Sequence, residues 1–354
     1  MCKGPMHDFL KALPKCEHHM HIEGSLEPDL LFTLAKRNNI KLPSASVDPS
    51  FESVETLLSR YRRFTSLDDF LHYYFIGMSV LVTSSDFESL AYAYFSRAAA
   101  SDGVAHAEIF FDPQAHTSRG VEYSTVVRGL EAARARALAD FGLTSELIVC
   151  ILRHLPAGDG RAMYETSALP DLESGVVRGL GLSSTELGNP PALFREPFLD
   201  AERRGFRRTA HAGEEAGVSY MAEALRELHV ERVDHGIKLL ESRDDVMAEF
   251  VRRRILVTLC PLSNVELRCV ERVSDLPVRE YLEAGVRFSI NSDDPAYFGG
   301  YVLDNYCAVQ DSFDLTKSEW ETIVRNGISG SWCGEDRKQQ MIETLEEVMV
   351  KFED

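Results

Sequence analysis

The chain has 354 residues, 44% of them hydrophobic, so it can bury a large core in one or two domains. Its formal net charge is −18, from 56 acidic and 38 basic residues, and this charge would repel a phosphate backbone. The composition therefore argues against a nucleic-acid polymer as partner and favours a small neutral or cationic substrate.

The cysteines and the N-terminus bear on the compartment. Seven cysteines without regular spacing argue against a disulfide framework and for a reducing environment. Met1–Leu10 has no apolar signal region, and no apolar run approaches membrane-spanning length. We therefore expect a cytoplasmic protein without membrane contact, whereas nuclear import and the oligomeric state stay open.

Eight short apolar runs have the composition of buried strands, and most of them end in turn or polar residues. The predicted strands are Lys15–Ile22, Val104–Phe111, Thr144–Leu152, Val176–Leu182, Arg207–Gly213, Arg232–Gly236, Ile255–Cys260 and Val286–Asn291. Helical patterns such as Ser124–Phe141, Met221–Leu228 and Asp245–Arg254 lie between them. This alternation predicts a parallel sheet, and eight repeats predict a closed (β/α)8 TIM-type barrel in the α/β class.

Two regions depart from simple alternation. An insertion over about residues 26–102 follows the first strand and should form a helical lid over the barrel. Its helical patterns are Glu27–Arg37, Ser53–Phe64, Asp68–Val82 and Ser85–Ala100. The tail, about residues 302–352, should form C-terminal helices on the outside. We expect residues 1–354 to form a single barrel domain.

The first polar segment is His19-Met20-His21. Residues two apart in a strand face the same side, so both imidazoles can point into a barrel mouth, while His18 and Met20 point away. Alone, such a pair fits either a metal site or a polar edge strand. Gly24 follows, where the backbone must turn or approach another group closely.

The second polar segment is His211-Ala-Gly-Glu214, after another strand. His211 is a candidate third metal ligand. Glu214 would lie in a cleft whose low dielectric raises the pKa of its carboxyl, which suits proton transfer. The alternative is an acidic helix N-terminus.

His235, in Asp234-His235-Gly236, ends a further strand. It could orient or deprotonate a metal-bound water, although a capping or core histidine is the alternative. His106-Ala-Glu108 matches the H-x-E of cytidine-type zinc deaminases, but no P-C-x-x-C follows, so that fold is not supported.

Asp293 and Asp294 follow the eighth predicted strand. Adjacent carboxylates repel each other unless something neutralises them, which a metal on Asp293 and a hydrogen-bonded substrate group on Asp294 would do. The alternative is an Asx turn before Pro295. Three histidines and one aspartate complete a zinc set, although iron or manganese could occupy such a site.

Five segments in this order resemble the adenosine/adenine deaminase family of metal-dependent hydrolases. LPKCEHHMHIEGSLEP resembles the family's first-strand motif, and HAGE, VDHG, CPLSN and NSDDP resemble the later ones. The resemblance runs from about Phe9 to Tyr306, and five motifs in order are highly specific. It implies a (β/α)8 barrel with one catalytic zinc ion per chain and a small purine as substrate.

The resemblance also implies a role for each site residue. The zinc ligands would be His19, His21, His211 and Asp293. Glu214 would protonate the ring nitrogen beside the amino-bearing carbon, and His235 would orient and help deprotonate the attacking water. Asp294 would hydrogen-bond the imidazole nitrogen of the purine.

Three details resemble the adenine-deaminase branch. Glu23 stands where adenosine deaminases usually carry a shorter Asp that holds the ribose, so its longer side chain would fill that space. The runs 108–120 and 180–191 also resemble this branch. Gly24, Glu23 and Ser184 would then contact the substrate, while Ser183, where the branch often has Asp, leaves the contacts of Ser184 open. The product would be hypoxanthine, in purine salvage.

Several alternatives stay open. The chain could act on adenosine or on an N6-modified adenine, because pocket size decides between these substrates. A two-metal barrel hydrolase acting on phosphoesters or cyclic amides is disfavoured, because no strand-end Lys is evident. A family member that binds purine without turnover is the non-enzymatic alternative, but all the predicted groups are present.

Overall fold

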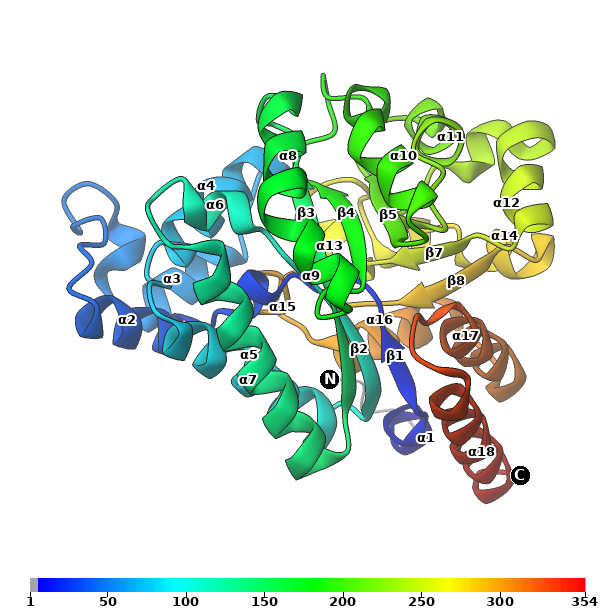
Figure 1. Ribbon diagram of the computed structural model, residues 1–354. Coiled ribbons are helices and arrows are strands. Elements are labelled where there is room, and N and C mark those ends of the chain that lie inside the picture. Colours follow the sequence, from blue (N-terminus) through cyan, green and yellow to red (C-terminus); the bar gives the residue numbers. More distant parts are fainter. Residues whose placement is uncertain (1–5, 354) are drawn as a thin grey trace.

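The computed structural model describes residues 6–353 and shows, within that range, eight parallel strands that neighbour one another in chain order (Figure 1). The strands are β1 (Lys15–Glu17), β2 (Val104–Phe111), β3 (Thr144–Leu152), β4 (Gly179–Ser183), β5 (Arg207–Ala212), β6 (Arg232–His235), β7 (Leu256–Leu259) and β8 (Arg287–Ile290). Residues 1–5, part of the segment assessed for a signal region, lie outside the described residues.

The first and last strands meet just beyond their ends. The backbone N–H of His21 donates to the carbonyl of Asp293 at 3.0 Å, and the N–H of Asp293 donates to the carbonyl of His19 at 3.0 Å. Met20 and Asp293 form a parallel bridge at this seam. The predicted (β/α)8 barrel is confirmed, and its seam runs through three residues predicted to bind metal.

Strand boundaries follow the predictions most closely where the apolar run is longest. β2 and β3 have the predicted bounds. β1 ends at Glu17 instead of Ile22, because the N–H of His18 donates to the Asn291 side chain at 2.8 Å and leaves the ladder. β4 begins at Gly179, later than predicted.

Helices connect the strands and cover the outside of the barrel. They are α1 (His7–Ala12), α2 (Pro28–Arg37), α3 (Val54–Tyr61), α4 (Leu67–Met78), α5 (Ser84–Ala100), α6 (Pro113–Thr117), α7 (Tyr123–Phe141), α8 (Ala157–Met163), α9 (Leu169–Ser174), α10 (Arg195–Arg203), α11 (Val218–Glu227), α12 (Ala248–Arg253), α13 (Pro261–Glu266), α14 (Val278–Ala284), α15 (Pro295–Phe298), α16 (Val302–Phe313), α17 (Lys317–Gly330) and α18 (Glu335–Lys351). No helix within the described residues is long and apolar enough to cross a bilayer.

Two helical groups flank the barrel at different sides. Helices α2 to α5 lie between β1 and β2 in the chain and occupy the left of Figure 1, whereas α17 and α18 lie together at the lower right. α17 packs against β8 and β1, at the seam of the barrel. The tail was expected to form helices on the outside, and it does.

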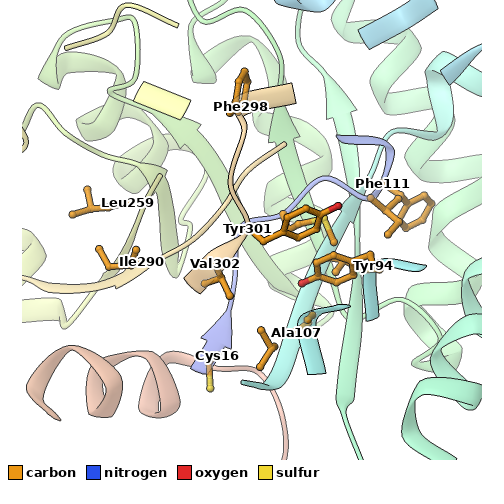
Figure 2. Packing of buried hydrophobic residues seen from close by; sticks show 14 of the residues in the cluster. Cys16, Tyr94, Ala107, Phe111, Leu259, Ile290, Phe298, Tyr301 and Val302 are labelled. Carbon is orange, nitrogen blue, oxygen red and sulfur yellow. The ribbon is translucent and has the colours of Figure 1, made fainter. Parts of the chain in front are cut away.

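The hydrophobic core lies between the strands and the surrounding helices. Cys16 of β1 and Ala107 of β2 point toward this layer, where Tyr94 of α5 and Val302 of α16 pack nearby (Figure 2). A smaller buried cluster consists of Phe110, Ile148, Cys150 and Trp332. The Phe110 ring lies 5.1 Å from His19 and 4.9 Å from His21, centroid to centroid, so this cluster forms an apolar floor beneath the predicted metal ligands.

Candidate metal centre and active site

The polar residues predicted from four strand ends converge at one end of the barrel. The ligand atoms of His19, His211, His235 and Asp293 all lie within 4.8 Å of one another, and the four residues are buried. His21 joins them, with its Nε2 at 3.1 Å from Nε2 of His211. In a parallel barrel the carboxyl ends of the strands share one face, which explains how residues far apart in sequence meet.

Two of the histidines are held so that Nε2 faces the centre of this group. Nδ1 of His211 donates to the carbonyl of Leu182 at 3.0 Å. Nδ1 of His19 lies 2.9 Å from the Thr258 hydroxyl, which donates its own hydrogen to Asp234 and must therefore accept from His19. Each Nε2 then carries a lone pair. Hydrogen bonds of this kind orient metal-binding imidazoles.

The two lone pairs differ: that of His211 faces Nε2 of His21, whereas that of His19 has no partner among the described residues. Nε2 of His19 is buried without a hydrogen-bond partner, 3.2 Å from Oδ1 of Asp293. Nε2 of His21 lies 3.6 Å from the same oxygen. Burial lowers the pKa of His21 to about 4 and that of His211 well below its usual value, so both imidazoles are neutral. Neutral imidazoles and a carboxylate form a donor set that fits a divalent cation.

Asp293 presents its two carboxylate oxygens to different neighbours. Oδ1 faces His19 and His21, whereas Oδ2 accepts a hydrogen bond from Ser263 at 2.6 Å. Burial alone would raise the pKa of Asp293, but the neighbouring imidazoles, His19 first and then His235 and His21, hold it well below its usual range. The backbone of Asp293 is left-handed (φ 64°), a strained conformation that is concentrated at functional sites.

His235 differs from the other three histidines in its hydrogen bonds. The amide nitrogen of Asn264 lies 3.2 Å from Nδ1, so Nδ1 accepts and the ring proton is on Nε2. That Nε2 lies 3.6 Å from Oε2 of Glu214 and 3.7 Å from Oδ2 of Asp293. His235 thus presents a hydrogen-bond donor to the acidic groups and lacks the free Nε2 lone pair that a ligand needs.

Glu214 lies directly after β5, buried beside His235. Burial raises the pKa of its carboxyl well above the usual value, and the charge of Asp293 raises it further. Its loop is fixed by the buried carboxylate of Glu186, which accepts the backbone N–H groups of Gly213 (3.3 Å), Glu214 (3.2 Å) and Ala216 (2.8 Å). A carboxyl whose protonated form is favoured in this way is suited to act as a general acid.

Asp294 and Gly24 lie in contact. A Cβ at Gly24 would sit 1.9 Å from Oδ1 of Asp294, so only glycine fits there. Oδ1 of Asp294 is buried without a hydrogen-bond partner, and the residue lines the cavity described below. Gly24 and Asp294 are therefore adjacent, and Oδ1 of Asp294 is left to hydrogen-bond another group.

Glu23 and Ser184 lie in different surroundings. Oε1 of Glu23 accepts hydrogen bonds from Nε2 of His116 (2.7 Å) and from the backbone N–H of Asp112 (3.1 Å), and Glu23 is not among the residues that line the cavity. Ser184 lines the cavity, has a left-handed backbone (φ 78°), and lies 2.7 Å from Nδ1 of His154 through its hydroxyl.

A cavity opens above the metal-ligand candidates. One wall is apolar and comes from helix α4, in the insertion predicted to form a lid. The cavity is lined by His21, Leu67, Phe70, Leu71, Tyr74, Phe75, Asp112, Leu152, Ser183, Ser184, His211, Glu214, His235, Leu267, Asp293 and Asp294. Sequence reasoning missed Asp112 and Glu186. Their positions at the end of β2 and after β4 are the signal that could have identified them.

The fold and these residues together indicate which class of protein this is. An eight-stranded parallel barrel with buried histidines and a carboxylate at the carboxyl ends of its strands offers a donor set that fits a metal ion. The sequence profile described as adenosine deaminase matches residues 14–348. The chain belongs to the adenosine deaminase family, a family of metal-dependent enzymes.

Individual relatives are similar over nearly their whole length. An adenine deaminase of Aspergillus oryzae is 55% identical over 98% of this chain and 97% of its own. One of Schizosaccharomyces pombe is 51% identical over 99% and 95%. The crystal structure of an adenine deaminase from Arthrobacter aurescens has a TM-score of 0.88 at 43% identity, covering 96% of this chain and 99% of its own. An amidohydrolase from Burkhoderia ambifaria with bound Zn has a TM-score of 0.82 at 25% identity, over 99% and 95%.

Proposed function

We propose that this chain hydrolyses adenine to hypoxanthine and ammonia. The observation that carries the proposal is the 55% identity to an adenine deaminase over 98% of the chain. Support also comes from the proposed metal ligands, Glu214, His235 and Asp294, which lie close together at the barrel mouth. The product would return to the purine pool, which places the reaction in purine salvage.

We propose zinc as the metal and His19, His21, His211 and Asp293 as its ligands. His21 is preferred to His235 because Nδ1 of His235 accepts from Asn264 and its Nε2 carries the proton. Zinc bound here would act as a Lewis acid that lowers the pKa of water toward about 7. A bound zinc in the amidohydrolase from Burkhoderia ambifaria supports this choice of metal.

The protein's own groups would then move the protons. Glu214 gives its proton to the ring nitrogen beside the amino-bearing carbon, which makes that carbon more electrophilic. His235 lies within reach of both Glu214 and Asp293, where its Nε2–H orients the attacking water. The proton of that water passes to the carboxylate of Glu214, which returns it to the leaving amine. Asp294 hydrogen-bonds the imidazole nitrogen of the purine, and Gly24 leaves the space that this contact needs. Addition of water and loss of ammonia balance the reaction.

We infer a single domain with a helical insertion. Buried residues from Phe9 to Val348, drawn from the barrel, the insertion and the C-terminal helices, belong to one hydrophobic cluster. An enzyme that sequesters adenine under α4 needs the insertion and the barrel to pack together, which this cluster supports.

The decisive experiment is ammonia release by zinc-replete protein from adenine and from adenosine in separate reactions. Release from adenine supports the proposal. Release from adenosine alone would keep the family and the metal centre but overturn the substrate. Absence of release from both would direct the test to N6-modified adenines.

A further inference from the structure

A carboxyl group without an assigned role lies in the cavity. Asp112 follows β2, is buried, and lines the cavity together with Glu214 and Asp294. Its Oδ1 accepts a hydrogen bond from the Ser183 hydroxyl at 3.1 Å, and its Oδ2 accepts one from the Tyr74 hydroxyl at 3.2 Å. Strand β4 and helix α4 therefore hold this side chain in one position.

Glu23 lies behind Asp112 and supports it. Oε1 of Glu23 accepts the backbone N–H of Asp112 at 3.1 Å and Nε2–H of His116 at 2.7 Å. Arg119 donates to Nδ1 of His116 at 2.7 Å, which places the His116 proton on Nε2. One oxygen of Glu23 is thus engaged in a buried network, and of these two carboxyls only that of Asp112 lines the cavity.

The proposed reaction leaves one edge of the purine without a partner. The amino-bearing carbon faces the metal centre, Glu214 serves the neighbouring ring nitrogen, and Asp294 serves the imidazole nitrogen N7. The remaining edge carries N3 and N9, and in free adenine bound through N7 the N9 atom bears a hydrogen. A buried N–H without an acceptor would cost about 10- to 100-fold in affinity.

Few polar groups of the cavity can accept that hydrogen. Among the described lining residues outside the proposed metal and catalytic set, the polar ones are Tyr74, Asp112, Ser183 and Ser184. The Tyr74 and Ser183 hydroxyls direct their hydrogens at Asp112, and the Ser184 hydroxyl lies against His154. Each keeps an accepting lone pair, but the carboxyl of Asp112, toward which two of these hydroxyls point, is the stronger acceptor. A carboxyl offers an accepting oxygen whether or not it carries a proton.

We propose that Asp112 accepts the N9–H of the free base and thereby selects adenine over purines substituted at N9. This proposal rests on the proposed function. A nucleoside has no hydrogen on N9 and places a carbon against this carboxyl. The resemblance to adenine deaminases gave the exclusion of a ribose to Glu23. In this proposal Asp112 has that role, and Glu23, Tyr74 and Ser183 position its carboxyl.

The test compares adenine with 9-methyladenine in zinc-loaded wild type and Asp112→Ala. We expect Asp112→Ala to lower kcat/KM for adenine about 10- to 100-fold and to leave or raise that for 9-methyladenine, so that the ratio narrows. Asp68→Asn is the matched control, because Asp68 is an exposed carboxylate on α4 that accepts from Thr185 at 3.1 Å without lining the cavity. For Asp68→Asn, the ratio of kcat/KM for adenine to kcat/KM for 9-methyladenine should equal that of the wild type.

Zinc content decides between two roles for Asp112, because Oδ2 also lies 4.0 Å from Nδ1 of His21. Loss of zinc from Asp112→Ala would assign the carboxyl to support of His21 and overturn the proposal, as would an unchanged ratio. A crystal structure of the wild type with hypoxanthine needs no variant: N9 within about 3.2 Å of Asp112 is expected, and N9 facing another group contradicts the proposal. A wild type inactive on adenine would instead refute the proposed function.

Discussion

The two ends of the barrel both bury polar and charged side chains, but the end opposite the cavity pairs most of its polar atoms within the protein. At the end opposite the cavity, Glu108 contacts Arg232 at 2.5 Å, His106 at 3.3 Å and the backbone N–H of Trp332. Of that network's described side chains, Arg232 alone has an atom without a partner, Nε, and its guanidinium lies 4.2 Å from the centroid of the Trp332 ring. His18 is satisfied by Ser289 and Ser331.

At the cavity end, the described residues leave several polar atoms unpaired. They are Nε2 of His19, Nδ1 of His21, Oε2 of Glu23, Oδ1 of Asn264 and Oδ1 of Asp294. An unpaired buried polar atom costs about 1–3 kcal/mol, so a cluster of them indicates a place for a missing partner. The difference between the ends separates groups that hold the fold from groups that await a ligand.

The largest effect should come from Glu214→Gln, at the cavity end. Loss of the general acid should lower kcat by about 10²–10⁴-fold, while zinc content stays that of the wild type. Burial raises the pKa of Glu214 in the folded protein. Above the pKa of the unfolded chain, folding must therefore protonate this carboxyl or bury its charge, and either costs stability. The Gln variant lacks this cost, so it should be at least as stable as the wild type at pH 7. Rapid kinetics, metal analysis and urea unfolding check this. Retention of most activity would remove Glu214 from its role.

Arg232→Met should show the reverse behaviour at the opposite end. It leaves Glu108 buried and unpaired, which should lower the free energy of unfolding by about 3–5 kcal/mol. kcat per folded, zinc-loaded molecule should not change. Adding Glu108→Gln should restore part of the stability in denaturant titrations. A loss of kcat without a loss of stability would mean that the two ends are not distinct in function.

His211→Ala should break the metal centre without disrupting the fold. Zinc retained after dialysis should fall well below that of the wild type. At zinc about 100-fold above its dissociation constant, binding should stabilise the wild type by about 2.7 kcal/mol but the variant by much less. Metal analysis and thermal unfolding with and without zinc measure both effects. Unchanged zinc content would exclude His211 as a ligand.

Lys15→Met gives the smallest effect and tests the satisfied end by pH. Lys15 is buried and its ammonium donates to the carbonyls of Leu10 (2.5 Å), Lys11 (3.2 Å) and Leu13 (3.2 Å). Burial lowers its pKa from 10.5 to about 7. Between these values the unfolded chain binds a proton that the folded protein lacks, so stability rises with pH, by about 2 kcal/mol from pH 7 to pH 9.

The Lys15→Met variant should lack this increase. Urea titrations of both proteins across that pH range give the difference, which cancels the other titrating groups. Parallel pH profiles for the two proteins would show that Lys15 keeps its proton in the folded state.

The sequence predicted the strands best where burial dominates. β2 and β3 are the two longest strands and are rich in Val, Ile, Leu and Phe, so their bounds followed directly from composition. β1 was too long because a hydrogen bond to Asn291, distant in sequence, replaces the expected ladder. Tertiary partners of this kind leave no local pattern. The helix expected at Asp245–Arg254 begins with a π-helical turn at Arg243–Met247, which periodicity does not reveal.

The site was predictable where residues form motifs and less so where they act alone. His19, His21, His211 and Asp293 come together as expected from strand-end positions. Asp112 precedes a proline and reads locally as the start of α6, so only its place at the end of β2 indicates a functional residue. The buried pairing of Glu23 with His116 depends on a residue 93 positions away, which no local rule anticipates.

The barrel seam ties the metal centre to the order in which the chain is made. His19 and His21 are synthesised early, but Asp293, which hydrogen-bonds to both through the backbone, is synthesised last of the proposed ligands. A nascent or truncated chain that ends before Asp293 lacks the carboxylate ligand and the closure of the sheet. The closure of the sheet and the proposed carboxylate ligand therefore become available together, once the eighth strand has been made.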